Sequence, residues 1–258
     1  MSPKYSSSEK EKKSERIVYG KNPIRELLEQ DQIKTIFYSS DQEDEIIKKA
    51  KGKGVKVEKR YLSELDQFVK SGNHQGLVAL AYGYDYADFD LLLETCRQKK
   101  GSSNLIFLDR IMDPHNLGAV ARSAYLLGMD GLIISLHKTA SVTSGTVKAS
   151  VGATNYLPIA RVINMGKSLD QVKEAGFQVA ALDMSGKVEL PAADFVNKST
   201  ALVVGSEHRG IRPSLLQRSD FGLQIPMTGK EIGSFNASVA ASLVMYEIYR
   251  QSFTVNQE

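Results

Sequence analysis

From Leu105 onward, short apolar runs alternate with stretches in which apolar residues recur at helical spacing. Regular alternation of strands and helices favours an α/β fold built on a mainly parallel sheet. The pattern predicts strands at 105–108, 132–135, 179–182, 202–205 and 223–226, and helices at 116–127, 145–151, 168–175, 212–217 and 236–250.

A second, smaller alternation occupies the first third of the chain. It predicts strands at 33–38, 55–57 and 76–81, and helices at 23–30, 44–51 and 63–70. Asn22 followed by Pro23 is a favourable helix start, because Asn caps a helix well and Pro fits its first position. We therefore expect four parts: a disordered tail (1–15), a small α/β domain (16–82), a linker with one helix (83–101) and a larger domain (102–258).

The composition of the chain indicates its cellular compartment and the kind of partner it can bind. Residues 1–15 are polar and Ser-rich, so we expect them to stay disordered, with a loose RNA-contacting arm as the alternative. They contain no apolar core of a secretory signal, and no apolar run of about eighteen residues exists that would cross a membrane. The single cysteine, Cys96, cannot form an internal disulfide and fits a cytoplasmic protein. A net charge of +3 permits a polyanionic partner without requiring one.

Several common site motifs are missing. No GxGxxG follows a predicted strand and no GxxxxGK[ST] occurs, so neither an ordinary dinucleotide site nor a P-loop is supported. The absence of CxxC and HExxH gives a metal site no basis, and no GxSxG suggests a hydrolase. Any nucleotide-like cofactor must therefore bind in another way.

Three segments place polar groups where predicted strands end. In the first, LDRIMDPHNLGAVARSA (108–124), Arg122 lies opposite the apolar stripe of a helix, and Asn116 is either its N-cap or a ligand group. In the second, ALVVGSEHRGI (201–211), Gly205 lets backbone approach a ligand and Glu207 follows the strand. In the third, Pro226 stops a strand, and a helix of small apolar residues begins near Ser234 or Asn236. Such a helix is buried in a core or at a subunit interface.

Together the three segments resemble motifs 1, 2 and 3 of the SpoU (TrmH-like) branch of the SPOUT RNA 2′-O-ribose methyltransferases. The resemblance is carried by DPHNLGAVARSA, by LVVGSEHRGI, and by LQIPM with SFNASVAAS. IVYGKNPIRELL and HQG are similar to the substrate-binding domain of RlmB-like 23S rRNA guanosine methyltransferases. The likeness spans about residues 16–250.

The resemblance implies a fold and a reaction. The expected catalytic domain is a parallel α/β sheet with a deep trefoil knot near its C-terminus, preceded by a small ribosomal-protein-like domain that binds RNA. The family transfers a methyl group from S-adenosylmethionine, held by the knot loops, to a ribose 2′-OH, here of a guanosine in 23S rRNA. Homodimerisation, with each site built at the interface, is also implied; a metal and a membrane are not.

The resemblance also assigns residues. By position, Asn116 and Arg122 match the polar pair of motif 1, Glu207 the carboxylate of motif 2, and Ser234 with Asn236 the pair of motif 3; these form the expected catalytic set. Cofactor contacts are implied for Gly205, Ile225 and Phe235. Phe235 departs from the family, which usually has Leu there, and the loop 226–234 is one residue longer.

Arg122 is the central catalytic candidate. Arginine stays protonated in proteins, so its expected role is to bind the target phosphate and stabilise the developing alkoxide, with a role as base left open. Phosphate contacts of the small domain are expected from Lys21, Arg25, Lys34, Lys59 and Arg60. The alternatives are a tRNA 2′-O-ribose methyltransferase, an rRNA adenosine methyltransferase conferring antibiotic resistance, and a non-catalytic RNA-binding or ribosome-assembly protein.

Overall fold

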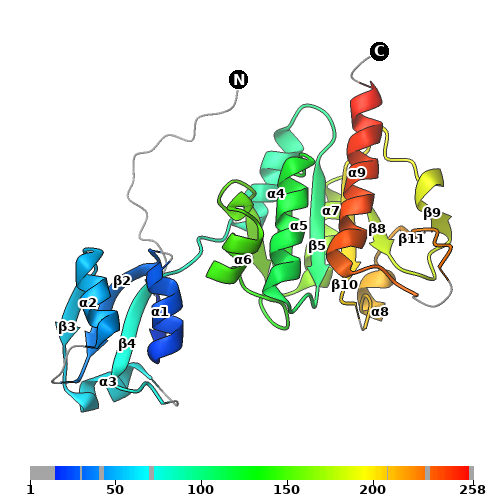
Figure 1. Ribbon diagram of the computed structural model, residues 1–258. Helices are drawn as coiled ribbons and strands as arrows, with labels where there is room; N and C mark the ends of the chain where they lie inside the picture. Colours follow the sequence, from blue (N-terminus) through cyan, green and yellow to red (C-terminus); the bar gives the residue numbers. More distant parts are fainter. Residues whose placement is uncertain are drawn as a thin grey trace. The chain divides into compact units, whose positions relative to one another are not determined.

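The computed structural model describes residues 15–29, 31–40, 44–69, 73–207, 209–229 and 233–255, and the chain divides into two compact units, Met1–Asp85 and Tyr86–Glu258 (Figure 1). The expected disordered tail lies outside the described residues, apart from Glu15, which begins a strand. The expected linker over 83–101 is not a separate part. Its helix α4 (Phe89–Gln98) buries Leu92, Leu93 and Cys96 in the core of the second unit.

The first unit is a four-stranded sheet with helices on both faces. Its strand order is β1-β4-β2-β3, in which β2 and β3 are parallel and the other pairs antiparallel. Helices α1 and α2 pack on one face and α3 on the other. The elements are β1 (Glu15–Tyr19), α1 (Lys21–Glu29), β2 (Ile33–Tyr38), α2 (Glu45–Gly52), β3 (Lys56–Lys59), α3 (Leu62–Phe68) and β4 (Leu77–Tyr82).

The HQG segment of this unit forms the turn that leads into β4. The buried His74 ring faces Asp66 Oδ1 at 2.9 Å through Nε2, and its Nδ1 accepts the backbone N–H of Gly76 at 3.2 Å. Gly76 has a φ of +74°, a conformation that glycine adopts without steric cost. These contacts give HQG a structural role within the unit.

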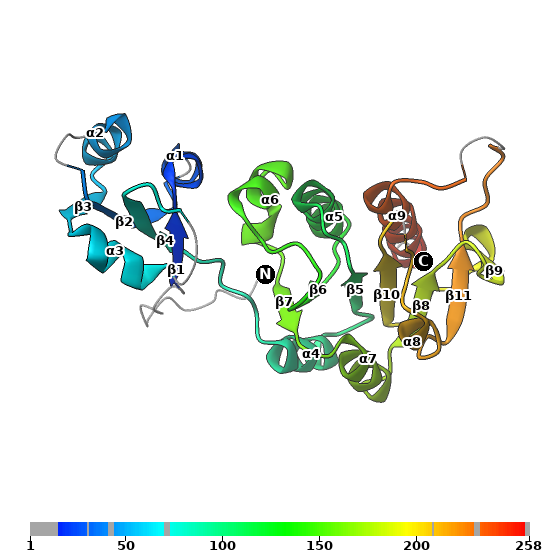
Figure 2. The ribbon, with the colours of Figure 1, turned by 90° about the horizontal axis from the view of Figure 1, so that it is seen from below.

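The second unit is a seven-stranded parallel sheet in the order β7-β6-β5-β10-β8-β11-β9. Helices α4 and α7 lie on one face, and α5, α6 and α9 on the other (Figure 2). This confirms the predicted α/β class. The elements are β5 (Asn104–Asp109), α5 (Pro114–Leu126), β6 (Gly131–Ser135), α6 (Ser144–Ala149), β7 (Ile159–Val162), α7 (Met165–Glu174), β8 (Gln178–Leu182), β9 (Val188–Glu189), β10 (Thr200–Gly205), α8 (Pro213–Leu216), β11 (Phe221–Gln224) and α9 (Ala237–Val255).

The core of this unit explains its sequence pattern. All six residues of β5 are buried, as are the first five of β10. Strands covered by helices on both faces read as continuous apolar runs, because neither side meets water. On the face covered by α4 and α7, helix α7 adds Leu169 and Val172 to the buried cluster around Phe107.

Strand β11 lies between β8 and β9, although β8 and β9 are consecutive in the chain. Residues 183–187 must therefore cross β11. Gly186 and Gly222 meet at this crossing: a Cβ on Gly186 would lie 2.7 Å from backbone atoms of Gly222 and Leu223. Because neither glycine has a Cβ, the backbone of residues 183–187 can pass close to that of β11.

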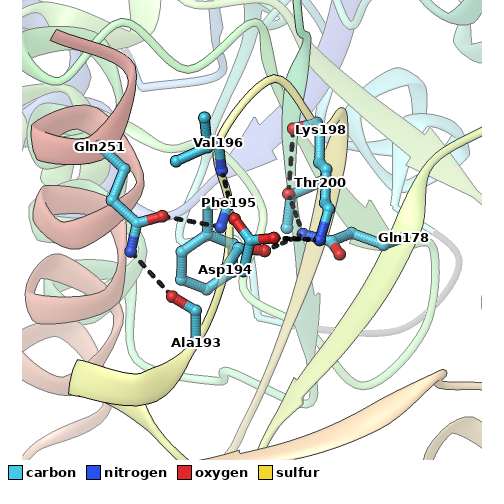
Figure 3. A network of polar contacts seen from close by, with 8 residues as sticks. All are labelled: Gln178, Ala193, Asp194, Phe195, Val196, Lys198, Thr200 and Gln251. Atoms are coloured by element: carbon cyan, nitrogen blue, oxygen red, sulfur yellow. Dashed lines mark hydrogen bonds and ion pairs between the residues drawn. The ribbon is translucent and has the colours of Figure 1, made fainter. Parts of the chain in front are cut away.

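Helix α9 is hydrogen-bonded to other segments at two positions, one near its C-terminal end and one nearer its start. Near its C-terminal end, Gln251 donates to Ala193 O (2.8 Å) and accepts from Phe195 N (2.8 Å), within a network that continues to Asp194 and Lys198 (Figure 3). Nearer its start, Ser242 Oγ donates to Ser123 Oγ of α5 at 2.8 Å. These contacts fix the position of the helix N-terminus. Among the described helices, none is long and apolar enough to cross a membrane.

Candidate active site

The three motif segments emerge at one edge of the sheet. Strands β5 and β10 are parallel neighbours, with Asp109 and Gly205 paired at their ends. β11 runs parallel in the same sheet. Because the carboxyl ends of parallel strands share an edge, the segments after β5, β10 and β11 all begin there.

Three side chains from these segments form one hydrogen-bonded triangle. Asn116 Nδ2 donates to Glu207 Oε1 at 3.1 Å, and Asn236 Nδ2 donates to Asn116 Oδ1 at 3.0 Å and also to Glu207 Oε1. The backbone N–H of Ala237 donates to the same carboxylate oxygen at 3.2 Å. The structure therefore brings together one predicted residue of each motif.

Asn236 has two roles at once. Its Oδ1 accepts the backbone N–H of Ser238 at 2.9 Å and of Val239 at 3.4 Å, which caps helix α9. Its Nδ2 is left to bind Asn116 and Glu207. Capping thus fixes the amide in the orientation that the triangle requires.

Asn116 is not the N-cap of its helix. Helix α5 begins two residues earlier than predicted, with Pro114 in its first turn and Asp113 as the cap, whose Oδ1 accepts the N–H of His115 at 2.9 Å. Proline at the start of a helix needs no hydrogen-bond acceptor, which favours this earlier start. Asn116 is therefore inside the helix, and its side chain is free to reach Glu207.

Gly205 is required by the fold of its own loop. A Cβ at this position would lie 2.2 Å from the carbonyl carbon of Gly210, so the backbone of the loop folds back against it. Gly210 N donates to Ser206 O at 2.8 Å and closes the loop that carries Glu207. His208 lies outside the described residues.

A buried carboxylate that none of the motifs indicated lies at the end of β5. Asp109 is fully buried and accepts from Arg212 Nε at 2.8 Å and from Arg212 N at 2.9 Å. It thereby ties the end of β5 to the segment after β10. In the sequence, Asp109 follows four apolar residues, 105–108, and its partner Arg212 lies far along the chain.

Arg122, Ser234, Ile225 and Phe235 are not part of the triangle. Arg122 is exposed on α5, about 9 Å along the helix axis from Asn116 at 1.5 Å per residue. Ile225 is half-buried after β11, and Ser234 and Phe235 are exposed just before α9. Among the described residues, no hydrogen bond joins Arg122 or Ser234 to Asn116, Glu207 or Asn236.

The predicted phosphate contacts of the small unit are engaged at its surface. Lys21 pairs with Asp44 at 2.6 Å, Lys34 with Glu15, and Arg60 with Glu58 at 2.7 Å. Arg25 donates to Asn22 Oδ1 at 3.5 Å. The carboxylates paired with Lys21, Lys34 and Arg60 are at least one-quarter exposed. Phosphate oxygens of RNA could therefore replace them at a small cost in free energy. In the described part of the chain, no cluster of three or more His, Cys, Asp or Glu residues could hold a metal ion.

The chain matches two family models. The SpoU rRNA Methylase family matches residues 103–246, and the RNA 2′-O ribose methyltransferase substrate binding family matches residues 17–87. A TrmH family tRNA/rRNA methyltransferase of Staphylococcus aureus is 39% identical over 243 residues, which is 94% of each chain.

Solved structures of similar proteins differ in how much of this chain they cover. The AdoMet-bound rRNA methyltransferase of Sinorhizobium meliloti is 25% identical with a TM-score of 0.60, over 92% of this chain and 87% of that one. The TrmH/SpoU tRNA modifying enzyme of A. aeolicus is 28% identical with a TM-score of 0.55, over 65% of this chain and 86% of that one. The family match and the relative agree: this chain belongs to the SpoU rRNA Methylase family.

Proposed function

We propose that this protein transfers a methyl group from S-adenosylmethionine to the ribose 2′-OH of a nucleotide in rRNA, with a guanosine of 23S rRNA as the substrate. Membership of the SpoU family makes it an RNA methyltransferase that uses this cofactor. The observation that carries the proposal is the triangle of Asn116, Glu207 and Asn236, which joins the three motif segments.

The extent of the similar structures favours rRNA over tRNA. The rRNA methyltransferase of S. meliloti covers both units of this chain, whereas the tRNA modifying enzyme of A. aeolicus covers 65% of it. The first unit is the part matched by the substrate-binding family. We assign it the task of holding rRNA, through surface cations that include Lys21, Lys34 and Arg60.

The segments at the sheet edge suit an adenine-containing cofactor. Exposed apolar side chains stand on them: Met184 after β8, Met227 after β11 and Phe235 before α9. Gly205, Ile225 and Phe235 would contact the adenine and methionine parts by backbone and apolar surface. When bound, the cofactor supplies an electrophilic methyl group on a sulfonium. The crossing at Gly186 and Gly222 supports a trefoil knot in this region.

The 2′-OH is a weak acid, and this chain's residues would ease its deprotonation. Arg122 binds the phosphate beside the target ribose and stabilises the charge that develops on the 2′ oxygen. Asn116, Asn236 and Ser234 orient the ribose, while Glu207 holds Asn116 and Asn236 in position. Most of the catalytic effect then comes from positioning.

The distance between Arg122 and the triangle supports a homodimer. Tyr125 and Leu126 lie one helical turn after Arg122, and α9 exposes Val239, Leu243 and Tyr246 at helical spacing. An exposed apolar face on two neighbouring helices is typical of a protein interface. A second copy seated there would bring its Arg122 to a site that one chain leaves incomplete. We place the dimer in the cytoplasm, in keeping with the lone, buried Cys96.

The test is methyl transfer from labelled S-adenosylmethionine to protein-free 23S rRNA, 16S rRNA and tRNA in parallel, followed by mapping of the modified nucleotide by primer extension. A single 2′-O-methyl stop at a guanosine of 23S rRNA is expected. Transfer to tRNA alone would replace the rRNA assignment. Cofactor binding without transfer to any RNA would favour a non-catalytic RNA-binding role.

A further inference from the structure

A cavity of about 540 Å³ opens beside the contact between Asn116 and Glu207. It lies where the segments after β5, β6 and β10 meet, and a hydrogen bond of 2.7 Å from Ala140 N to Ile111 O joins two of these segments. Five charged residues line it: Arg110, Asp113, Lys138, Glu207 and Arg209.

Two of the lining cations have unusual backbones. Arg110 has a φ of +60° and Lys138 a φ of +59°, in the left-handed region that favours glycine. A residue with a long side chain is strained there, and such strain collects at functional sites, where the side chain is needed. At both positions the side chain is a cation that lines the cavity.

The charge beside the cavity is not balanced. The buried Asp109 already accepts two hydrogen bonds from Arg212. Arg110 Nε lies 3.6 Å from Asp109 Oδ2, too far for a hydrogen bond, and it is buried without an acceptor. Two guanidinium groups thus share one carboxylate; Arg110 Nη2 also donates to Gly210 O at 3.4 Å, and only its buried Nε is without an acceptor. An anion in the cavity would offset this excess charge.

The two carboxylates of the wall, Asp113 and Glu207, offset two of its three cations and leave one positive charge. Asp113 accepts the N–H of His115 as the helix cap, and Glu207 accepts from Asn116, Asn236 and Ala237. Lys138 and Arg209 are exposed, and neither forms an ion pair within the described residues. The cationic groups are therefore the ones available to a ligand.

We propose that Arg110, Lys138 and Arg209 form a binding site for one phosphodiester of the RNA substrate, distinct from the phosphate assigned to Arg122. This inference rests on the proposed function, since it takes RNA as the ligand. A phosphodiester has a charge that offsets these cations and oxygens that accept from their N–H groups. Its place next to Asn116 would set which ribose along the strand reaches the triangle.

The test compares the full-length protein with three variants: Arg110→Gly, Arg110→Lys and Arg97→Gln. Glycine removes the charge and suits the backbone of Arg110, so we expect this variant to fold. Arg97 is an exposed cation on α4 and serves as the matched control. Binding of a 23S rRNA transcript is measured by filter binding over a series of KCl concentrations, and binding of S-adenosylmethionine by calorimetry.

Arg110→Gly should bind the transcript roughly tenfold more weakly, the scale of one charge-assisted hydrogen bond. The slope of log Kd against log salt should fall by about 0.7, as expected for one lost phosphate contact to single-stranded RNA. Arg110→Lys should keep the slope, and Arg97→Gln should match the wild type, with cofactor binding unchanged in all.

Unchanged RNA affinity and slope in Arg110→Gly would overturn the inference. Weaker cofactor binding with unchanged RNA binding would also overturn it, because the anion would then be the cofactor's carboxylate. If the wild type binds the transcript but transfers no methyl group, the proposed function fails while the phosphate site stands. If the wild type binds no RNA, both fail.

Discussion

The side-chain amide of Asn236 donates a hydrogen bond of 3.0 Å to the side-chain oxygen of Asn116, 120 residues earlier in the sequence. One residue caps α9 and the other lies in the first turn of α5. The contact therefore depends on how these two helices pack. Any change that shifts α9 along α5 would separate the groups of the site.

Glu207 offers a test of charge against hydrogen bonding. Its three partners all donate to the same oxygen, Oε1. Glu207→Gln keeps an oxygen acceptor and loses the charge. Glu207→Ala removes the acceptor and leaves the three donors without a partner at this position. We expect Ala to lower the free energy of unfolding by about 1–2 kcal/mol and Gln by clearly less, measured by urea denaturation. Equal losses would mean that the charge, and not the acceptor, holds the triangle.

Arg122→Ala should abolish transfer while leaving the fold intact. The side chain is exposed, so we expect the free energy of unfolding to change by no more than about 0.5 kcal/mol. Loss of a group that stabilises a developing charge should lower kcat by about a hundredfold or more. Cofactor affinity, measured by calorimetry, should stay near normal. Lys167→Ala on the exposed start of α7 is the control, and near-normal turnover of Arg122→Ala would refute the assignment.

Leu243→Arg should disrupt the proposed dimer. Leu243 is 38% exposed on the apolar face of α9, and a charge there would be buried by a second copy. Light scattering after size exclusion should show the mass of one chain for this variant and of two for the wild type. Leu91→Arg, at an exposed apolar position on α4, should remain dimeric. A monomeric wild type would remove the dimer from the proposal.

Gly186→Ala should destabilise the crossing of β11. The added Cβ would lie 2.7 Å from backbone atoms, which cannot move aside as a flexible side chain can. We expect a loss of about 3 kcal/mol in the free energy of unfolding. Gly145→Ala is the matched control in the same unit, because the nearest atom to its Cβ would be 3.6 Å away. Similar values for both variants would contradict the close approach.

Cys96 should make stability fall at high pH. Burial raises the pKa of its thiol to about 11, from 9.0. The unfolded thiol loses its proton first as pH rises, so stability is complete below pH 9 and is lost toward pH 11. The loss between pH 8 and 11 should be about 2 kcal/mol. Denaturation of the wild type and of Cys96→Ala over this range should show the steeper decline in the wild type; parallel curves would contradict it.

Much of the fold was predictable because buried strands and amphipathic helices leave different periods in the sequence. Strands β2 and β8 lie close to where the pattern places them. Three strands were missed for physical reasons. β1 begins in the charged segment and exposes Ile17 and Tyr19, β7 has four residues after a proline, and β9 has two.

The candidate site was predictable in part. The resemblance to the family motifs pointed to Asn116, Glu207 and Asn236 as site residues. Nothing local in the sequence says that they touch, since the contact depends on the packing of α5 and α9. The role of Asp109 was missed because a buried carboxylate is recognised by its partners, here Arg212, which lies 103 residues away. The positive φ of Arg110 could not be predicted either, because arginine is not a residue type that favours this conformation.

Helix α9 has a consequence for biosynthesis. Ribosomes make a chain from its N-terminus, so Asn116 and Glu207 exist before Asn236 is translated. The sheet strands from β5 to β11 all precede α9, and the polar triangle can close only after this helix has been made and has docked on α5. A nascent chain paused before residue 236 would therefore lack the triangle, however much of the sheet had already folded.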